Sequence, residues 1–364
     1  MGIDDLVAKR LFSQRIEGNK PDTPEETVRW MGAVQAQEYE QALWAIALRM
    51  QSAKKKDIEE AIAAGKIIRT WPMRGTMHFV TPKDSRWMLK LSEARMLKKA
   101  EARMMGLNID ESLVNTCMGF FREALRDKKV LTRQEMMTLL EKEGIATKDQ
   151  RGYHLLWQAA QRGIICMGPM QDKKQTFMLL DDVTPESPNL TKDEALGELA
   201  LRYITSHGPA TVHDFAWWAG LYLPDARRGI EIAEPKVTFE KRNGEELWSS
   251  LESPSPKPIP EPSIRLLPSF DEYLIGYKER SEVLDAEHLL EVSPGNNGTS
   301  HPIVVVDGRV TGIWKQDIRK NAIDLNFIFF VPILYEKELI YREAERYSDF
   351  LNLQLATVTI AIRK

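Results

Sequence analysis

The chain has 364 residues, 43% hydrophobic and 28% charged, a mixture that can bury the cores of roughly two to four compact units and argues against wholesale disorder. The net charge of −3 argues against indiscriminate coating of nucleic acid, although a local basic channel remains compatible with it. No apolar run approaches the about 18 residues of a membrane helix, and the start of the chain lacks a secretory signal. We therefore expect a cytoplasmic protein, associated with the nucleoid in a bacterium.

Helices followed by a β-hairpin recur along the chain, a pattern typical of winged helix-turn-helix units. The first helix begins at Thr23, where Pro24 and Glu26 complete a capping-box pattern. The apolar spacing over residues 43–48 predicts a second helix, and extended runs on either side of residues 73–75 predict the hairpin. The first winged-helix unit is therefore expected before residue 106.

The same plan is predicted twice more. In the second copy a helix starts near Thr132 and a hairpin spans residues 164–180. In the third copy an apolar stripe covers residues 195–204, and Asn243-Gly244 is the dipeptide that a type I′ hairpin turn requires.

The proline-rich stretch "SPSPKPIPEP" cannot form a helix or a central strand, because each proline lacks an N–H donor and fixes φ. Beyond it, strand-like runs and one helix near residues 336–351 suggest a β-rich, barrel-like domain. The predicted fold class is thus α+β, with three tandem winged helices followed by this domain. The expected divisions are 1–105, 106–188 and 189–252 for the winged-helix units, 253–263 for the linker and 264–364 for the C-terminal domain.

Cysteine and histidine give no metal framework. Cys117 and Cys166 lack a Cys-x-x-Cys partner, and the six histidines are scattered without ligand spacing. We expect no metal and no cofactor.

Basic side chains lie near each predicted hairpin and are candidates for contacts with DNA phosphates. The alternative is a solvated hairpin surface, since phosphate binding is a property of a whole patch. Trp217 and Trp218 lie within one short helix, where core packing is the alternative to stacking on DNA. The candidate basic residues are Lys66, Arg69 and Arg74 in the first unit, Lys173 and Lys174 in the second, and Lys236, Lys241 and Arg242 in the third.

Three motifs together, "VQAQ", "RTWPMRGTMHFV" and "PSFDEYLIGYKER", resemble the AlkZ-like (YcaQ-like) family of bacterial alkylpurine DNA glycosylases. The resemblance covers nearly the whole chain and implies three winged helices and a C-terminal β domain. It also implies that Gln35-Ala36-Gln37 is the catalytic motif. The implied activity is excision of N-alkylated purines from double-stranded DNA, in some members from interstrand crosslinks.

The chemistry of such a substrate suits neutral amides. Alkylation at purine N7 or N3 leaves the base cationic, so no acid is needed to make it a leaving group. The enzyme must hold the lesion, stabilise positive charge on the sugar and place a water at the anomeric carbon. An amide can orient a water through its donor and acceptor atoms, although it cannot take the proton as a carboxylate would.

The spacing of the two glutamines constrains their backbone. Residues two apart diverge by about 200° on a helix but share a face of an extended segment. If Gln35 and Gln37 serve one water, residues 35–37 must be extended or form a turn at a helix end. The alternative is that both amides tie backbone groups at a helix junction. The neighbouring Glu38 and Glu40 either favour a cationic base or interact with the helix dipole.

Other candidates also carry two interpretations. His78 either reaches the site or a phosphate, or is a structural hairpin histidine. Asp271 and Arg280 are expected to pair and fix an interdomain joint, in preference to a direct role. No lysine is marked as a Schiff-base nucleophile, so a monofunctional enzyme is expected. An open groove, with no deep base pocket, would admit bulky lesions without full flipping of the nucleotide.

Two rival functions carry no catalysis. A winged-helix regulator would need a recognition helix with base-reading Arg, Asn or Gln, and "TVHDFAWWAGL" in the third unit has none. A protein-interaction scaffold is the other alternative, because winged helices also bind proteins. A monomer that binds DNA, without a membrane partner, is expected.

Overall fold

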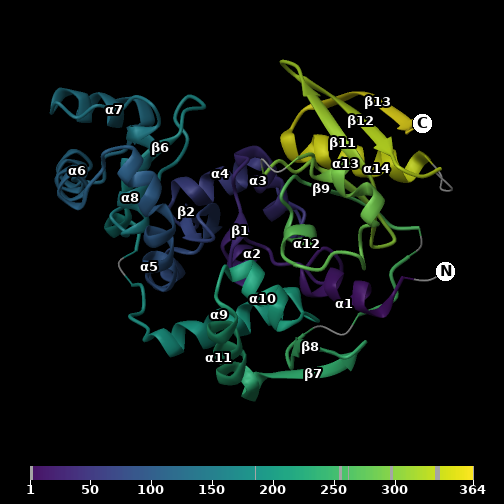
Figure 1. Ribbon diagram of the computed structural model, residues 1–364. Helices are drawn as coiled ribbons and strands as arrows, with labels where there is room; N and C mark the ends of the chain where they lie inside the picture. Colours follow the sequence, from purple (N-terminus) through teal and green to yellow (C-terminus); the bar gives the residue numbers. More distant parts are fainter. Residues whose placement is uncertain are drawn as a thin grey trace. The chain divides into compact units, whose positions relative to one another are not determined.

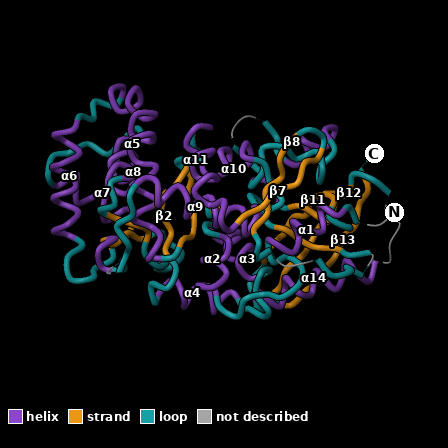
Figure 2. Tube along the Cα trace, turned by 90° about the horizontal axis from the view of Figure 1, so that it is seen from below, coloured by secondary structure: helices purple, strands orange, loops and turns teal. Residues whose placement is uncertain are grey.

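The computed structural model divides into two compact units, each containing helices and strands (Figures 1 and 2). Unit 1 contains Met1–Ile58 and Gly197–Lys364, and unit 2 contains Glu59–Leu196. The α+β class is therefore confirmed. No described helix is long and apolar enough to cross a membrane. The structure describes residues 3–184, 186–253, 256–260, 262–295, 298–332 and 337–363.

The N-terminal part of unit 1 has the helices that local signals predict. The capping box is present, because the Glu26 N–H donates to Thr23 Oγ1 at 3.2 Å and the Thr23 N–H donates to Glu26 Oε2 at 3.2 Å. Gly32, with φ of 76°, ends this helix. The elements here are α1 (Asp5–Ser13), α2 (Pro24–Met31), β1 (Val34–Gln35), α3 (Tyr39–Ala47) and the first turn of α4 (Lys55–Ala63), whose remaining residues belong to unit 2.

A second group of helices and a hairpin follow in residues 192–250. The predicted apolar stripe is buried, and the turn at Asn243 and Gly244 has φ of 51° and 83°, as a type I′ turn requires. The elements are α9 (Lys192–His207), α10 (Val212–Ala219), α11 (Leu223–Ala233), η2 (Glu234–Lys236), β7 (Val237–Arg242) and β8 (Glu245–Ser250).

The C-terminal part of unit 1 is a five-stranded sheet with the order β13-β12-β11-β10-β9. Its strands β12 and β13 are parallel and are connected through α14, which contacts the edge strands β9 and β13 (Figure 1). The sheet among the described residues is open, so the barrel-like prediction is wrong in this respect. The strands are β9 (Ile264–Leu267), β10 (Ile303–Val306), β11 (Arg309–Ile318), β12 (Ala322–Phe329) and β13 (Gln354–Ile362), and the helices are α12 (Glu272–Ile275), η3 (Ala286–His288), α13 (Leu289–Val292) and α14 (Lys337–Leu351).

Unit 2 joins two hairpins into one sheet. Arg69 of β2 pairs with Met167 of β5, so the hairpin predicted for the first winged helix shares a sheet with the hairpin of the second. Trp71 and Phe121 lie in the common core. The strands are β2 (Ile68–Met73), β3 (Thr76–Val80), β4 (Leu131–Thr132), β5 (Ile165–Met167) and β6 (Thr176–Leu179), and the helices are α5 (Pro82–Gly106), α6 (Glu111–Ala124), α7 (Arg133–Lys142), α8 (Arg151–Gln161) and η1 (Leu180–Asp182).

The predicted linker, residues 253–263, is described only in part. Residues 254, 255 and 261 lie outside the described residues, and residues 256–260 have neither helix nor strand. The predicted domain limits remain a prediction.

Candidate active site around Gln35 and Gln37

The side chains of Gln35 and Gln37 meet. Gln35 ends β1, Gln37 lies in the turn before α3, and Gln35 Nε2 donates a hydrogen bond to Gln37 Oε1 at 2.5 Å. The segment is therefore extended and then turns at a helix start, which is the backbone expected if both amides serve one water.

The two amides differ in exposure. Gln35 is 7% exposed, whereas Gln37 is an exposed residue. The pair thus reaches from the interior to the surface of unit 1, and Gln37 is not walled into a deep pocket. This arrangement fits the expectation of an open site.

A buried carboxylate holds the backbone of Gln35. The Gln35 N–H donates to Glu272 Oε1 at 3.0 Å, and the Trp218 indole N–H donates to Glu272 Oε2 at the same distance. His207 Nε2 lies 3.6 Å from Glu272 Oε2, and all three supporting side chains are fully buried. Helices α9, α10 and α12 therefore converge on one backbone amide of the motif.

A buried ion pair lies beside this carboxylate and corrects one expectation. Asp271 accepts two hydrogen bonds from Arg49, each at 2.8 Å, so its partner is Arg49 and the predicted pairing with Arg280 is wrong. The reason is that Asp271 caps α12 by accepting from the Tyr273 N–H, which turns its carboxylate toward α3 inside the unit. Arg280 instead donates to the Tyr277 carbonyl at 3.2 Å.

Gln14 connects the Arg49 guanidinium to the backbone of Glu272. Its Oε1 accepts from Arg49 at 2.9 Å, and its Nε2 donates to the Glu272 carbonyl at 3.2 Å and lies 3.1 Å from the Tyr277 hydroxyl. Each polar atom of this amide thus has a partner, as burial demands. Helix α1 is therefore tied to both α3 and α12.

The "GY" of the FDEYLIGY stretch supports the same network. A Cβ on Gly276 would meet His207 Cδ2 at 2.7 Å, so only glycine lets α12 lie this close to the imidazole ring. Tyr277 donates its hydroxyl to the His207 carbonyl at 2.7 Å, and burial raises the pKa of this phenol to about 12. The Tyr203 ring stacks on His207 with centroids 4.7 Å apart.

The two glutamates beside the motif are placed differently. Exposed Glu38 precedes α3 and accepts from the Ser269 hydroxyl at 2.9 Å. Glu40 lies in the first turn of α3 and pairs with Lys55 at 2.7 Å, which agrees with the helix-dipole interpretation. Glu38 is thus the carboxylate adjacent to Gln37 at the surface.

The predicted residues of the β2–β3 hairpin are engaged within unit 2. Arg69 is 7% exposed and donates to Gln175 Oε1 at 2.7 Å, which argues against its predicted phosphate contact. His78 is fully buried, with ring nitrogens 3.0 Å from the Thr76 carbonyl and 3.2 Å from Arg74 Nη2. These contacts agree with the structural interpretation of the histidine.

The remaining candidates of the hairpins lie mostly at the surface. Lys173 and Lys174 are exposed in the turn between β5 and β6, and Lys236 and Lys241 are exposed near β7. Arg242 is bound to Asp4 by hydrogen bonds of 3.1 and 3.2 Å, which leaves it less available for DNA.

The tryptophan pair is divided between the core and the surface. Trp218 is fully buried on Glu272, whereas Trp217 is 46% exposed and donates its indole N–H to the Ile275 carbonyl at 3.1 Å. Among the described residues, no group of three or more His, Cys, Asp or Glu side chains could hold a metal ion.

Several of these contacts were not predicted from the sequence. Glu272 and Trp218 stood in motifs already singled out, yet neither pattern shows that they meet at Gln35. Gln14, Arg49 and His207 carried no motif. The one feature of the sequence that could have indicated them is a polar residue at a position where the helical pattern predicts a buried, apolar one.

Comparisons with known proteins agree with one another. A family model described as DNA glycosylase AlkZ-like matches residues 28–350. An interstrand DNA cross-link repair glycosylase from Streptomyces sahachiroi is 31% identical over 336 residues, covering 85% of this chain and 86% of the relative. The solved structure of Streptomyces sahachiroi DNA glycosylase AlkZ matches with a TM-score of 0.82 and 25% identity, covering 99% of this chain and 100% of that one.

Proposed function

This chain belongs to the AlkZ-like DNA glycosylase family, and we therefore propose that it excises cationic N7- or N3-alkylated purines from DNA, with Gln35 and Gln37 positioning the water. The family gives the coarser statement, a DNA glycosylase that acts in repair. The finer proposal is carried by one observation, the hydrogen bond between the buried Gln35 amide and the exposed Gln37 amide.

The proposed reaction needs no acid catalyst. The water oxygen forms a bond to the anomeric carbon, while the carbon–nitrogen bond breaks and both of its electrons pass to the cationic purine. The base leaves neutral, and the water loses one proton to solvent. The glutamine amides supply orientation of the water, which is an entropic contribution to the rate.

Carboxylates near the motif suit the charge that develops on the sugar. The Glu272 carboxylate accepts a hydrogen bond from the Gln35 N–H, and Glu38 is next to Gln37 in the chain and is exposed. Negative groups at fixed positions stabilise an oxocarbenium-like transition state without having to reorganise. We assign Glu272 to positioning and Glu38 to electrostatic stabilisation.

The exposure of Gln37 supports a broad lesion range. A lesion too bulky for a closed pocket, including an interstrand crosslink like the one named for the Streptomyces relative, can approach an amide at the surface. We propose that segments 1–105, 106–188 and 189–252 act as winged helices on duplex DNA, with the exposed Lys173, Lys174 and Lys241 on phosphates.

The first test uses duplex DNA that contains N7-methylguanine. We expect release of free base, and a roughly 100-fold slower rate for Gln37→Ala because the water loses its orientation. Gln51→Ala changes another exposed glutamine of unit 1 and should be as active as the wild type. Duplex containing O6-methylguanine, which is alkylated but neutral, should stay intact.

Two outcomes would contradict the proposal. Unchanged base release by Gln37→Ala would remove the glutamine from the reaction, and sequence-selective binding without base release would favour a regulator. A monofunctional enzyme should leave an intact strand that breaks only on alkali treatment. Trapping of the protein on DNA by borohydride would show a lysine Schiff base instead.

A further inference from the structure

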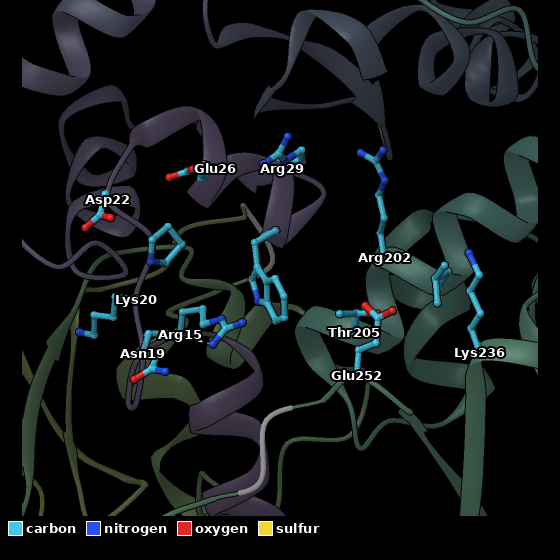
Figure 3. Close-up of a pocket in the computed structure, with 13 residues that line it drawn as sticks. Arg15, Asn19, Lys20, Asp22, Glu26, Arg29, Arg202, Thr205, Lys236 and Glu252 are labelled. Carbon is cyan, nitrogen blue, oxygen red and sulfur yellow. Dashed lines mark hydrogen bonds between the residues drawn. The ribbon is translucent and has the colours of Figure 1, made fainter.

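A second polar site lies in unit 1, in a pocket of about 570 Å³ (Figure 3). It is bounded by the α1–α2 loop, α2, α9 and the two ends of the β7–β8 hairpin. This volume falls within the range of about 300–1,000 Å³ for ligand sites. Five lining residues are basic and three are acidic, and they are Arg15, Lys20, Arg29, Arg202, Lys236, Asp22, Glu26 and Glu252.

Two cations of this pocket differ from Arg202, which pairs with Glu198 at 2.7 Å. The side chains of Arg29 and Lys236 are exposed and make no hydrogen bond or ion pair with any residue that the structure describes. By contrast, the Glu26 carboxylate is already used by the capping box of α2. Arg29 and Lys236 are therefore available to an anion, in a pocket whose lining contains five basic and three acidic side chains.

Arg15 is a preorganised donor. Its guanidinium lies 3.7 Å from the centroid of the Trp30 ring, and Nη1 donates to the Asn19 carbonyl at 3.0 Å. Its Nε is buried without a hydrogen-bond partner among the described residues, and burial lowers the pKa of this guanidinium. A desolvated guanidinium held by a ring and a carbonyl is stabilised when an anion binds to it.

The pocket is connected to the glutamine motif through one helix end. Arg29 and Trp30 lie in the last turn of α2, and Gly32 ends that helix before β1. A Cβ on Gly32 would lie 3.5 Å from both Arg202 of the pocket and Trp218 of the Glu272 network. An anion bound in the pocket would therefore hold the segment that leads to Gln35.

We propose that this pocket binds a backbone phosphate of a DNA strand, through Arg15, Arg29 and Lys236, at a position separate from the reacting nucleotide. Arginine presents several N–H donors to phosphate oxygens, and lysine adds a point charge. The choice of DNA as the source of the phosphate rests on the proposed function. Glu252 lies in the same pocket and opposes binding, so the affinity can be changed in both directions.

The test measures binding of undamaged duplex, separately from base release. Arg29→Ala and Lys236→Ala should each weaken binding several-fold and lower the slope of log Kd against log salt by about one, as expected for one lost phosphate contact. Glu252→Gln should strengthen binding. Arg342→Ala and Lys337→Ala remove exposed basic residues of α14 as matched controls and should leave Kd and slope unchanged.

Other outcomes would overturn the proposal. Unchanged Kd and slope for Arg29→Ala and Lys236→Ala would exclude a strand phosphate here. If inorganic phosphate or a nucleoside monophosphate binds with an affinity that depends on Arg29 while duplex affinity does not, the pocket serves a free phosphate compound. If the variants weaken duplex binding but the wild type releases no base, the phosphate site in the pocket is supported and the proposed glycosylase function is contradicted.

Discussion

Unit 1 contains two charged regions that are built in opposite ways. Around Gln35 the carboxylates of Asp271 and Glu272 are buried, and each accepts hydrogen bonds from donors on other elements. In the pocket, Arg29 and Lys236 are exposed and have no carboxylate partner among the described residues. The buried carboxylates fix the geometry around Gln35, whereas the exposed cations of the pocket are available to a ligand. The reason is that a buried charge must be compensated and an exposed one need not be.

The largest loss of stability is expected when the buried ion pair between Asp271 and Arg49 is broken. Asp271→Ala leaves Arg49 buried without its carboxylate, so the free energy of unfolding of unit 1 should fall by about 3–5 kcal/mol, measured by chemical denaturation. Arg49→Met combined with Asp271→Leu should recover part of this loss. Arg280→Ala is the control for the pairing predicted from sequence, and a loss equal to that of Asp271→Ala would contradict the structure.

Replacing Glu272 with glutamine tests whether its carboxylate positions the Gln35 backbone, because the two side chains have nearly the same shape. In Glu272→Gln, the new amide NH2 must face either the Gln35 N–H or the Trp218 indole N–H, which places donor against donor. We expect kcat for release of N7-methylguanine to fall about 10- to 100-fold while the Kd for DNA stays constant. Adding Trp218→Phe removes one donor and should restore part of kcat, whereas a purely structural role would make the double variant worse.

Lys20 at the edge of the pocket allows a test through pH. It donates to the Leu48 carbonyl at 2.6 Å, and burial, with Arg346 and Arg265 nearby, lowers its pKa to about 7 despite the opposing charges of Glu17 and Glu343. Between pH 7 and its ordinary pKa of 10.5, the unfolded chain binds more protons, so this lysine makes stability rise with pH in that window and fall toward pH 7.

The matching variant is Lys20→Met. The free energy of unfolding of the wild type should rise between pH 7 and pH 9.5, measured in urea, and that rise should be reduced in the variant. Identical slopes for the two proteins would show that Lys20 titrates normally.

The smallest change in stability is expected at Arg29, an exposed cation of the pocket, in contrast to the buried Asp271. Because the exposed Arg29 side chain makes no hydrogen bond or ion pair with a described residue, Arg29→Ala should change the free energy of unfolding by no more than about 0.5 kcal/mol. The same urea titration measures it. A loss as large as that of Asp271→Ala would mean that the pocket, too, holds structural charge.

Local signals predicted the elements well because their causes are local. The capping box at Thr23 and the turn at Asn243-Gly244 each depend on a few neighbouring residues, and both are confirmed. In these two cases the sequence contains the whole physical argument. The spacing of Gln35 and Gln37 stated only which backbone would let both amides serve one water, an extended segment or a turn at a helix end, and the backbone has that form.

Long-range contacts had no such local cause. Gln35 and Glu272 are 237 residues apart, and nothing near either residue indicates that they meet. The wrong pairing of Asp271 with Arg280 came from their closeness in sequence, whereas burial turned Asp271 toward Arg49. Arg69 was expected on a hairpin surface, but β2 is a central strand of its sheet and is buried along its whole length.

The discontinuity of unit 1 has a consequence for protein synthesis. Both glutamines leave the ribosome within the first 37 residues, but the carboxylate that holds the Gln35 backbone is residue 272, after all of unit 2. A chain interrupted before that point carries the whole motif without its support. The contact that supports the Gln35 backbone can therefore form only once synthesis has passed residue 272, within the second half of unit 1.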